Sequence, residues 1–276
     1  MKVLIFGGTH GNEWTGVMAV TQYAEVFKKK FPTLDLHFVL CNPEAYKINR
    51  RFKDEDLNRA FQFLHESRPD SYEHHRAREL KALIDAQDCF VIDLHTTTSH
   101  MGKTVILCHN HPLNLKVSEE LTQKMRDCRI ILSPDPNKKY LASQSEMGMM
   151  IEVGPVANGL VEPVVLEGTL SILEGILSAL AAPSETLKNC VEVYEEIQDV
   201  HYPQSENNLP SAYIHSDFQG KDFCEINGDY TPFKTFAGHN IHLKTNEKLY
   251  PIFINEAAYY PQQLAYTLCR KRILKY

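Results

Sequence analysis

Residues 3–13 read VLIFGGTHGNE, in which an apolar segment leads directly into a glycine-rich turn that carries His10 and Glu13. A second apolar segment, residues 90–94 (FVIDL), ends on His95. Two histidines and a carboxylate form a ligand set that Zn²⁺ accepts while one coordination position stays open for water, as in catalytic zinc sites. The sequence therefore predicts that His10, Glu13 and His95 hold one zinc ion per subunit.

Apolar strand-like segments alternate with helical segments through the first part of the chain. We expect strands over residues 2–6, 34–41, 89–94, 104–108, 129–132 and 149–153, and helices over residues 14–30 and 166–182. This alternation predicts an α/β sheet with helices on its faces. In such sheets ligands bind beyond the carboxyl ends of the strands, and the three candidate ligands all follow strands.

The pattern changes near residue 184. A helix-like segment over residues 185–196 is followed by short strand-like pieces, with turn residues such as those at 227–229 between them. We therefore expect a catalytic domain over residues 1–196 and a smaller, β-rich C-terminal domain over residues 197–276.

Composition limits the classes of function. The net charge of −6 is mild and the basic residues form no long run, which argues against nucleic-acid binding. The seven cysteines include no Cys-x-x-Cys pair, which argues against a disulfide framework and a thiolate zinc site. With no signal peptide and no apolar run near about 18 residues, we expect a cytoplasmic protein without a membrane partner.

The glycine-rich turn has an alternative interpretation as a nucleotide loop, because a strand, glycines and a helix in this order suit phosphate binding. Its spacing, however, is Gly-Gly-x-x-Gly rather than Gly-x-Gly-x-x-Gly. No Gly-Lys-Ser/Thr follows either, so the turn is not a Walker loop. The metal interpretation is therefore favoured.

Several further residues suit chemistry at such a metal. Arg51 and Arg59 flank Asn58 in a charged stretch that would bind a substrate carboxylate, since arginine grips carboxylates through two nitrogens. Glu152 is a single glutamate in an apolar strand, and burial there would raise its pKa toward that of a general base. Asp93 could orient an imidazole. The alternatives are a solvated loop for the charged stretch and a surface-facing position for Glu152.

Five segments together resemble the aspartoacylase and succinylglutamate desuccinylase family, which is related to zinc carboxypeptidases. They are GGTHGNE (7–13), DLNR (56–59), DLHTTTS (93–99), IEVGP (151–155) and NEAAYY (255–260). The resemblance covers nearly the whole chain. It implies a zinc-carboxypeptidase-like mixed sheet flanked by helices, with a C-terminal β part that caps the cleft and restricts entry to small substrates.

The resemblance implies a role for each matching residue. His10, Glu13 and His95 would hold Zn²⁺. Glu152 would take a proton from zinc-bound water and later deliver it to the leaving amine. Arg51 would stabilise the oxyanion of the tetrahedral intermediate.

The same resemblance implies how substrate is bound. Asn58 and Arg59 would grip a substrate carboxylate, and Tyr140 and Tyr259 would line the pocket and hydrogen-bond the substrate. Gln144 stands where relatives that prefer N-acetylaspartate have an arginine, four residues after the pocket tyrosine.

A second departure lies at Gln263, where a lysine follows the paired tyrosines in those relatives. Both changes remove positive charge from the part of the pocket that faces the substrate side chain. Lys103 or Lys221 could compensate for this loss.

The sequence thus predicts zinc-dependent hydrolysis of the amide bond of an N-acyl-L-amino acid, with N-acetyl-L-aspartate as the leading substrate. An aminoacylase for neutral or aromatic N-acetyl amino acids and a small-peptide metallocarboxypeptidase are the enzymatic alternatives. A binding protein with a structural zinc is a third. The expected partner is a small-molecule substrate, and a homo-oligomer is among the expectations because many relatives are assemblies.

Overall fold

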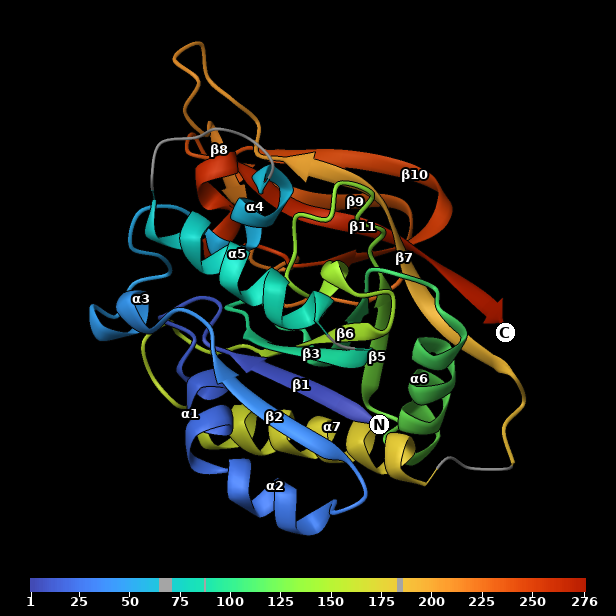
Figure 1. Ribbon diagram of the computed structural model, residues 1–276. Coiled ribbons are helices and arrows are strands. Elements are labelled where there is room, and N and C mark those ends of the chain that lie inside the picture. The colour runs from blue at the N-terminus through green and yellow to red at the C-terminus, as the bar shows by residue number, and fades with distance from the viewer. Residues whose placement is uncertain (65–70, 87, 183–185) are drawn as a thin grey trace.

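The computed structural model describes residues 1–64, 71–86, 88–182 and 186–276 (Figure 1). Its strands are β1 (Lys2–Gly7), β2 (Asp35–Leu40), β3 (Cys89–Thr96), β4 (Gly102–Leu107), β5 (Cys128–Leu132), β6 (Gly148–Gly154), β7 (Cys190–His201), β8 (Ala212–Ile214), β9 (Ile226–Thr235), β10 (Asn240–Ile252) and β11 (Leu264–Lys275). Its helices are α1 (Trp14–Gln22), α2 (Ala24–Lys30), α3 (Pro43–Lys47), α4 (Leu57–Ala60), α5 (Tyr72–Asp85), α6 (Pro112–Lys124) and α7 (Pro163–Ala181), with short 3-10 helices η1 (Phe61–Phe63), η2 (Ala142–Gln144) and η3 (Ala257–Gln262).

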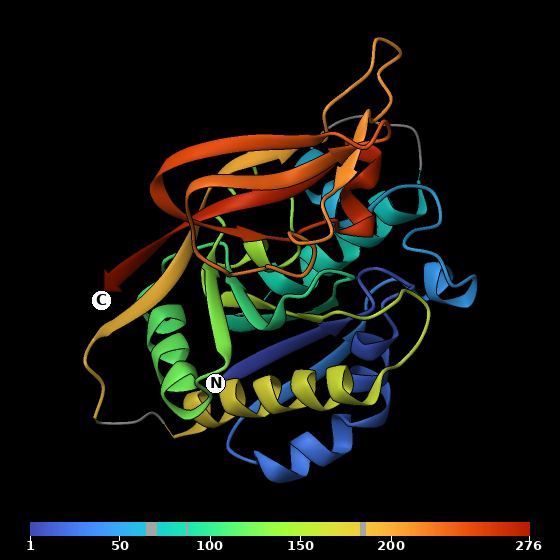
Figure 2. The same cartoon turned by 180° about the vertical axis from the view of Figure 1, so that it is seen from behind.

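The strands form one continuous ladder in the order β2-β1-β3-β6-β4-β5-β7-β11-β10-β9-β8. Strands β2, β1, β3 and β6 run parallel, β4 runs antiparallel to β6, and β5 and β7 then run parallel to β4. From β7 onward every pairing is antiparallel. The last strands stand over one side of the α/β part in both views (Figures 1 and 2). This arrangement confirms the predicted mixed α/β sheet with a β-rich C-terminal part.

Strand β1 shows why its sequence is apolar at every position. Val3 and Ile5 belong to the core cluster beneath α1, α2, α6 and α7. Leu4 and Phe6 point to the other face and join the cluster under α4 and α5. Helices therefore cover both faces of the parallel strands (Figure 1), which is the setting that gives strands an uninterrupted apolar run.

The helix-like interpretation of residues 185–196 is wrong: residues 186–189 form no helix, β7 begins at residue 190, and residue 185 lies outside the described residues. Buried Val191 and Val193 alternate with exposed Glu192, which is the period of a strand. The predicted division between residues 196 and 197 falls inside β7. The strand begins in the α/β part, beside β5, and continues along β11 into the C-terminal part.

Two predictions about helices also change. The predicted helix over residues 14–30 is two helices, α1 and α2, which meet at Tyr23. The expectation of no apolar run near about 18 residues is wrong for α7, whose length and composition would let it cross a membrane. Half of that stretch is buried, and α7 packs on β6, α6 and α1, as the core helix of a globular protein does.

Candidate active site

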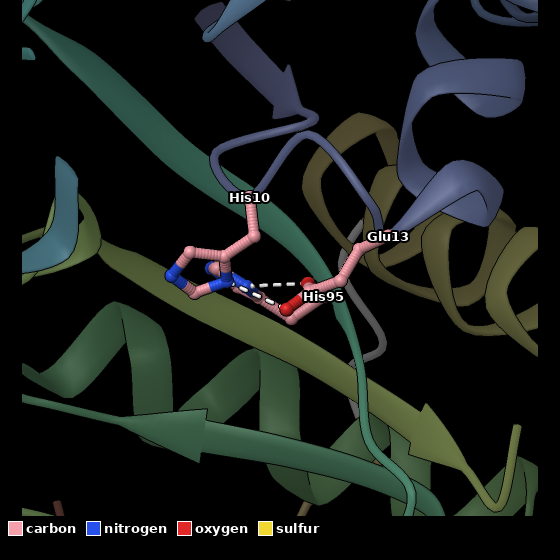
Figure 3. Close-up of side chains that lie close together, drawn as sticks. All are labelled: His10, Glu13 and His95. Atoms are coloured by element: carbon pink, nitrogen blue, oxygen red, sulfur yellow. Dashed lines mark hydrogen bonds and ion pairs between the residues drawn. The ribbon is translucent and has the colours of Figure 1, made fainter. Parts of the chain in front are cut away.

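The three predicted metal ligands converge at the carboxyl end of the parallel strands. His10 and Glu13 lie on the loop between β1 and α1, and His95 lies near the end of β3 (Figure 3). His10 Nδ1 is 2.6 Å from Glu13 Oε1, and His95 Nδ1 is 3.0 Å from Glu13 Oε2. All three side chains are buried, and one ligand atom from each lies within 4.8 Å of the others.

The glycines of this loop serve its packing. Gly8 has φ of +67°, a left-handed conformation that favours glycine. A Cβ at Gly11 would lie 2.2 Å from backbone atoms of Ala45 and Tyr46 in α3, so only glycine permits this close approach. These contacts account for both glycines without a bound phosphate.

Two aspartates contact the histidine rings at Nε2, the nitrogen that does not face Glu13. Asp93 Oδ2 lies 2.7 Å from His95 Nε2, and Asp93 Oδ1 accepts a hydrogen bond from the Thr9 hydroxyl. Asp56 Oδ1 lies 3.2 Å from His10 Nε2. Such carboxylates fix the ring orientation and make the imidazole a better ligand. The sequence predicted this role for Asp93 but not for Asp56, although Asp56 opens one of the matching segments.

The charges of the cluster stabilise one another. Burial alone raises the pKa of Glu13, but the adjacent His10 and His95 rings outweigh it and hold the pKa well below its usual range. Burial lowers the pKa of His95, and the carboxylates of Asp93 and Glu13 reverse this effect and raise it well above the usual value. Two imidazoles and an ionised carboxylate are a donor set that fits Zn²⁺ with a fourth position left for water.

Glu152 lies beside this cluster because of strand register. β3 and β6 are parallel neighbours in which His95 pairs directly with Glu152, and both side chains line the same cavity. Burial raises the pKa of Glu152 well above its usual value, and the negative charges of Glu13 and Glu256 act in the same direction. A carboxyl group of this kind suits proton transfer near neutral pH.

Arg51 joins the charged loop to the cluster of candidate metal ligands. Its Nε donates to Asp56 Oδ2 at 3.0 Å, and its Nη1 donates to Glu13 Oε1 at 3.4 Å. The loop is held by buried Glu73 of α5, whose carboxylate accepts the backbone N–H groups of residues 53, 54 and 55. The charged stretch is therefore an ordered wall of the site.

Asn58 and Arg59 follow on α4. Asn58 Oδ1 accepts the backbone N–H of Leu141, which ties α4 to the segment that carries Tyr140. The Arg59 guanidinium lies over the Tyr140 ring, 5.2 Å from its centroid. Both residues line the cavity together with Tyr140 and Tyr259. Tyr259 comes from η3, so the C-terminal part supplies one wall of the cavity.

Glu256 connects that wall to the α/β part. One of its oxygens accepts hydrogen bonds from the backbone N–H groups of Thr98 and Ser99 and from the hydroxyls of residues 97–99. These residues directly follow β3, the strand that carries His95. The other oxygen accepts the N–H of Ala258 at the start of η3. Glu256 lies in the last matching segment, but its residue type and spacing alone indicated no such role.

The structure does not bring Gln144 into this group. Its amide donates to the backbone carbonyls of Lys138 and Tyr140, so the side chain folds back on its own segment. Gln263, which departs from the family pattern in the same way, donates to the carbonyl of Asn208. Lys103 forms an ion pair with Asp127 at 3.0 Å and faces a different cavity, and Lys221 is exposed. None of these residues lines the cavity that contains the histidines.

Models of known protein families match both the α/β part and the C-terminal part of the chain. A family model described as the succinylglutamate desuccinylase/aspartoacylase catalytic domain matches residues 1–180. The chain belongs to this family. A second model, the AstE/AspA barrel-sandwich hybrid domain, matches residues 189–271, so the β-rich C-terminal part is also a family feature.

Individual relatives of the family match the full length. A probable aspartoacylase from Trichodesmium erythraeum is 31% identical over 99% of this chain and 98% of its own length. An N-acyl-aromatic-L-amino acid amidohydrolase from Xenopus laevis is 32% identical, over 98% of this chain and 94% of its own. The crystal structure of murine aminoacylase 3 superposes with a TM-score of 0.90 at 28% identity, covering 99% of this chain and 96% of that one.

Proposed function

We propose that this protein is a zinc-dependent amidohydrolase that cleaves the amide bond of small N-acyl-L-amino acids. The observation that carries this proposal is the buried cluster of His10, Glu13 and His95 with Glu152 paired beside it in register. Full-length similarity to a probable aspartoacylase and to an N-acyl-aromatic-L-amino acid amidohydrolase supports the same class of substrate.

When bound by His10, Glu13 and His95, zinc would act as a Lewis acid and lower the pKa of a water molecule to about 7. Glu152 would accept a proton from water and deliver it to the amide nitrogen as the C–N bond breaks, so that a carboxylic acid and a free amino acid leave. Arg51 would donate to the oxygen on which negative charge develops.

Asn58 and Arg59 would orient the substrate through its α-carboxylate. The guanidinium of Arg59 is held over Tyr140 and the amide of Asn58 is fixed by Leu141, so both are ordered before substrate arrives. Ordered groups lose less freedom on binding and place the scissile bond reproducibly.

The test is release of acetate by protein of known metal content, with and without chelator. The panel contains N-acetyl-L-aspartate, which leads on sequence grounds, and the N-acetyl derivatives of glutamate, methionine and tyrosine, with a tetrapeptide added. We expect chelator-sensitive release that zinc restores. No release from any N-acetyl amino acid would overturn the proposal, and faster cleavage of the tetrapeptide would point to a carboxypeptidase.

A further inference from the structure

The proposed function leaves one carboxyl group of the cavity without a role. Glu196, on β7, lines the same cavity as His10 and Glu152. One of its oxygens accepts a hydrogen bond from the buried Ser133 hydroxyl at 2.5 Å. The same cavity is also lined by the apolar residues Ile106, Met150 and Phe253. Its lining therefore combines the carboxyl group and the hydroxyl with apolar side chains.

An irregularity in the sheet lies next to Glu196. Consecutive residues Leu268 and Cys269 of β11 pair with Gln198 and Glu196 of β7, so one residue of β7 between them has no counterpart. Such bulges alter the direction of side chains and are frequent beside active sites. The preceding residue, Glu195, instead forms an ion pair with Arg272 at 2.6 Å and does not line the cavity.

The charge of Glu196 is poorly compensated. Burial raises its pKa to about 7; the Ser133 hydrogen bond and the charge of Lys139 oppose this rise, and Asp199 adds to it. The Lys139 ammonium lies over the Tyr140 ring, 4.7 Å from its centroid, and Lys139 does not line the cavity. Arg51 and Arg59, which do line it, lie on the wall formed by the charged loop and α4.

We propose that Glu196, together with Ser133, receives the end of the substrate's amino-acid side chain and selects an uncharged hydrogen-bond donor, such as a carboxamide, over a carboxylate. This inference rests on the proposed function. A donor would satisfy the carboxylate oxygens, and the apolar stem of the side chain would lie against residues such as Ile106 and Met150. A substrate carboxylate would instead meet a like charge in a cavity partly shielded from water, where repulsion is stronger than in bulk solvent.

The experiment compares two substrates of nearly equal shape, N-acetyl-L-glutamine and N-acetyl-L-glutamate, at pH 8, where Glu196 is mostly ionised. For the wild type we expect kcat/KM to favour glutamine by roughly 10- to 100-fold. In Glu196→Gln the ratio should fall at least about tenfold, mainly because the glutamate derivative becomes a better substrate. The matched control is Glu195→Gln, which makes the same change of charge one residue away.

Each outcome decides the inference. A wild type that favours the glutamate derivative overturns it without reference to any variant. It is also overturned by an unchanged ratio in Glu196→Gln, or by an equal shift in Glu195→Gln, which would be an effect of net charge alone. Metal-replete wild type that hydrolyses no N-acyl amino acid defeats the proposed function itself, whereas hydrolysis with an unaltered ratio defeats only the role of Glu196.

Discussion

Two parts of the cavity hold their carboxyl groups in different ways. Among the metal ligands and their supports, Glu13, Asp56 and Asp93 each lie against a histidine ring, and Arg51 reaches two of the three. On the wall formed by β5 and β7, Glu196 has only a serine hydroxyl as its hydrogen-bond donor among the described residues. The carboxylates of the first part are engaged by the histidine rings that they position. The Glu196 carboxylate has no such partner in the part of the chain that the structure describes and can therefore interact with a substrate.

The largest expected effect lies next to the first part, at Glu152, which pairs in register with His95. In Glu152→Gln we expect kcat to fall by about 100- to 10,000-fold, because the amide cannot accept and return a proton. Bound metal should stay near the wild-type level, since Glu152 is not a member of the ligand cluster. Metal content and steady-state kinetics on the best substrate measure both.

Glu146→Gln is the control for this change, because Glu146 is 65% exposed and lies outside the cavity. Turnover near the wild-type rate in Glu152→Gln would remove Glu152 as the proton carrier. It would also mean that the carboxyl groups around the histidines bind the metal while another group carries the proton.

A smaller effect is expected at Asp93, which touches no substrate and acts through His95. Asp93→Asn keeps the shape of the side chain but removes the charge that faces His95 Nε2, so zinc affinity should fall by about 10- to 100-fold. Competition with a chromophoric chelator measures the affinity, and Asp35→Asn, at a position 62% exposed, is the control. An unchanged affinity would show that the buried charge behind His95 does not support the metal.

The same contrast explains what could be predicted from sequence. The candidate metal ligands lie on the loop that follows β1 and near the end of β3, so residue type, spacing and strand ends together mark them. Glu196 is one of several acidic residues in a stretch whose sequence resembles a helix. Whether its side chain faces the cavity depends on the register of β7 against β5 and β11. Register is a long-range property that local periodicity does not contain.

Asp56 and Gln144 show two ways in which prediction from sequence fails: a role was missed at Asp56, and a role was expected at Gln144 that the structure does not support. Asp56 supports His10 across a separation of 46 residues, a contact that only the folded loop creates. The family resemblance predicts a substrate-binding residue at position 144, but the Gln144 amide donates to backbone carbonyls of its own segment. A matching position therefore predicts a functional residue only where the backbone also directs the side chain into the cavity.

The smallest effect is expected at Gln144, and it sharpens the contrast with Glu196. Restoring the family's positive charge by Gln144→Arg should change the preference between N-acetylglutamate and N-acetylglutamine by less than about threefold, because position 144 does not line the cavity. Kinetics on the same two substrates at pH 8 measure this, and thermal unfolding shows whether the larger side chain is tolerated. If Gln144→Arg instead raised the preference for the acidic substrate as strongly as Glu196→Gln, the selective charge of this cavity would lie near η2. The wall formed by β5 and β7 would then be a passive surface.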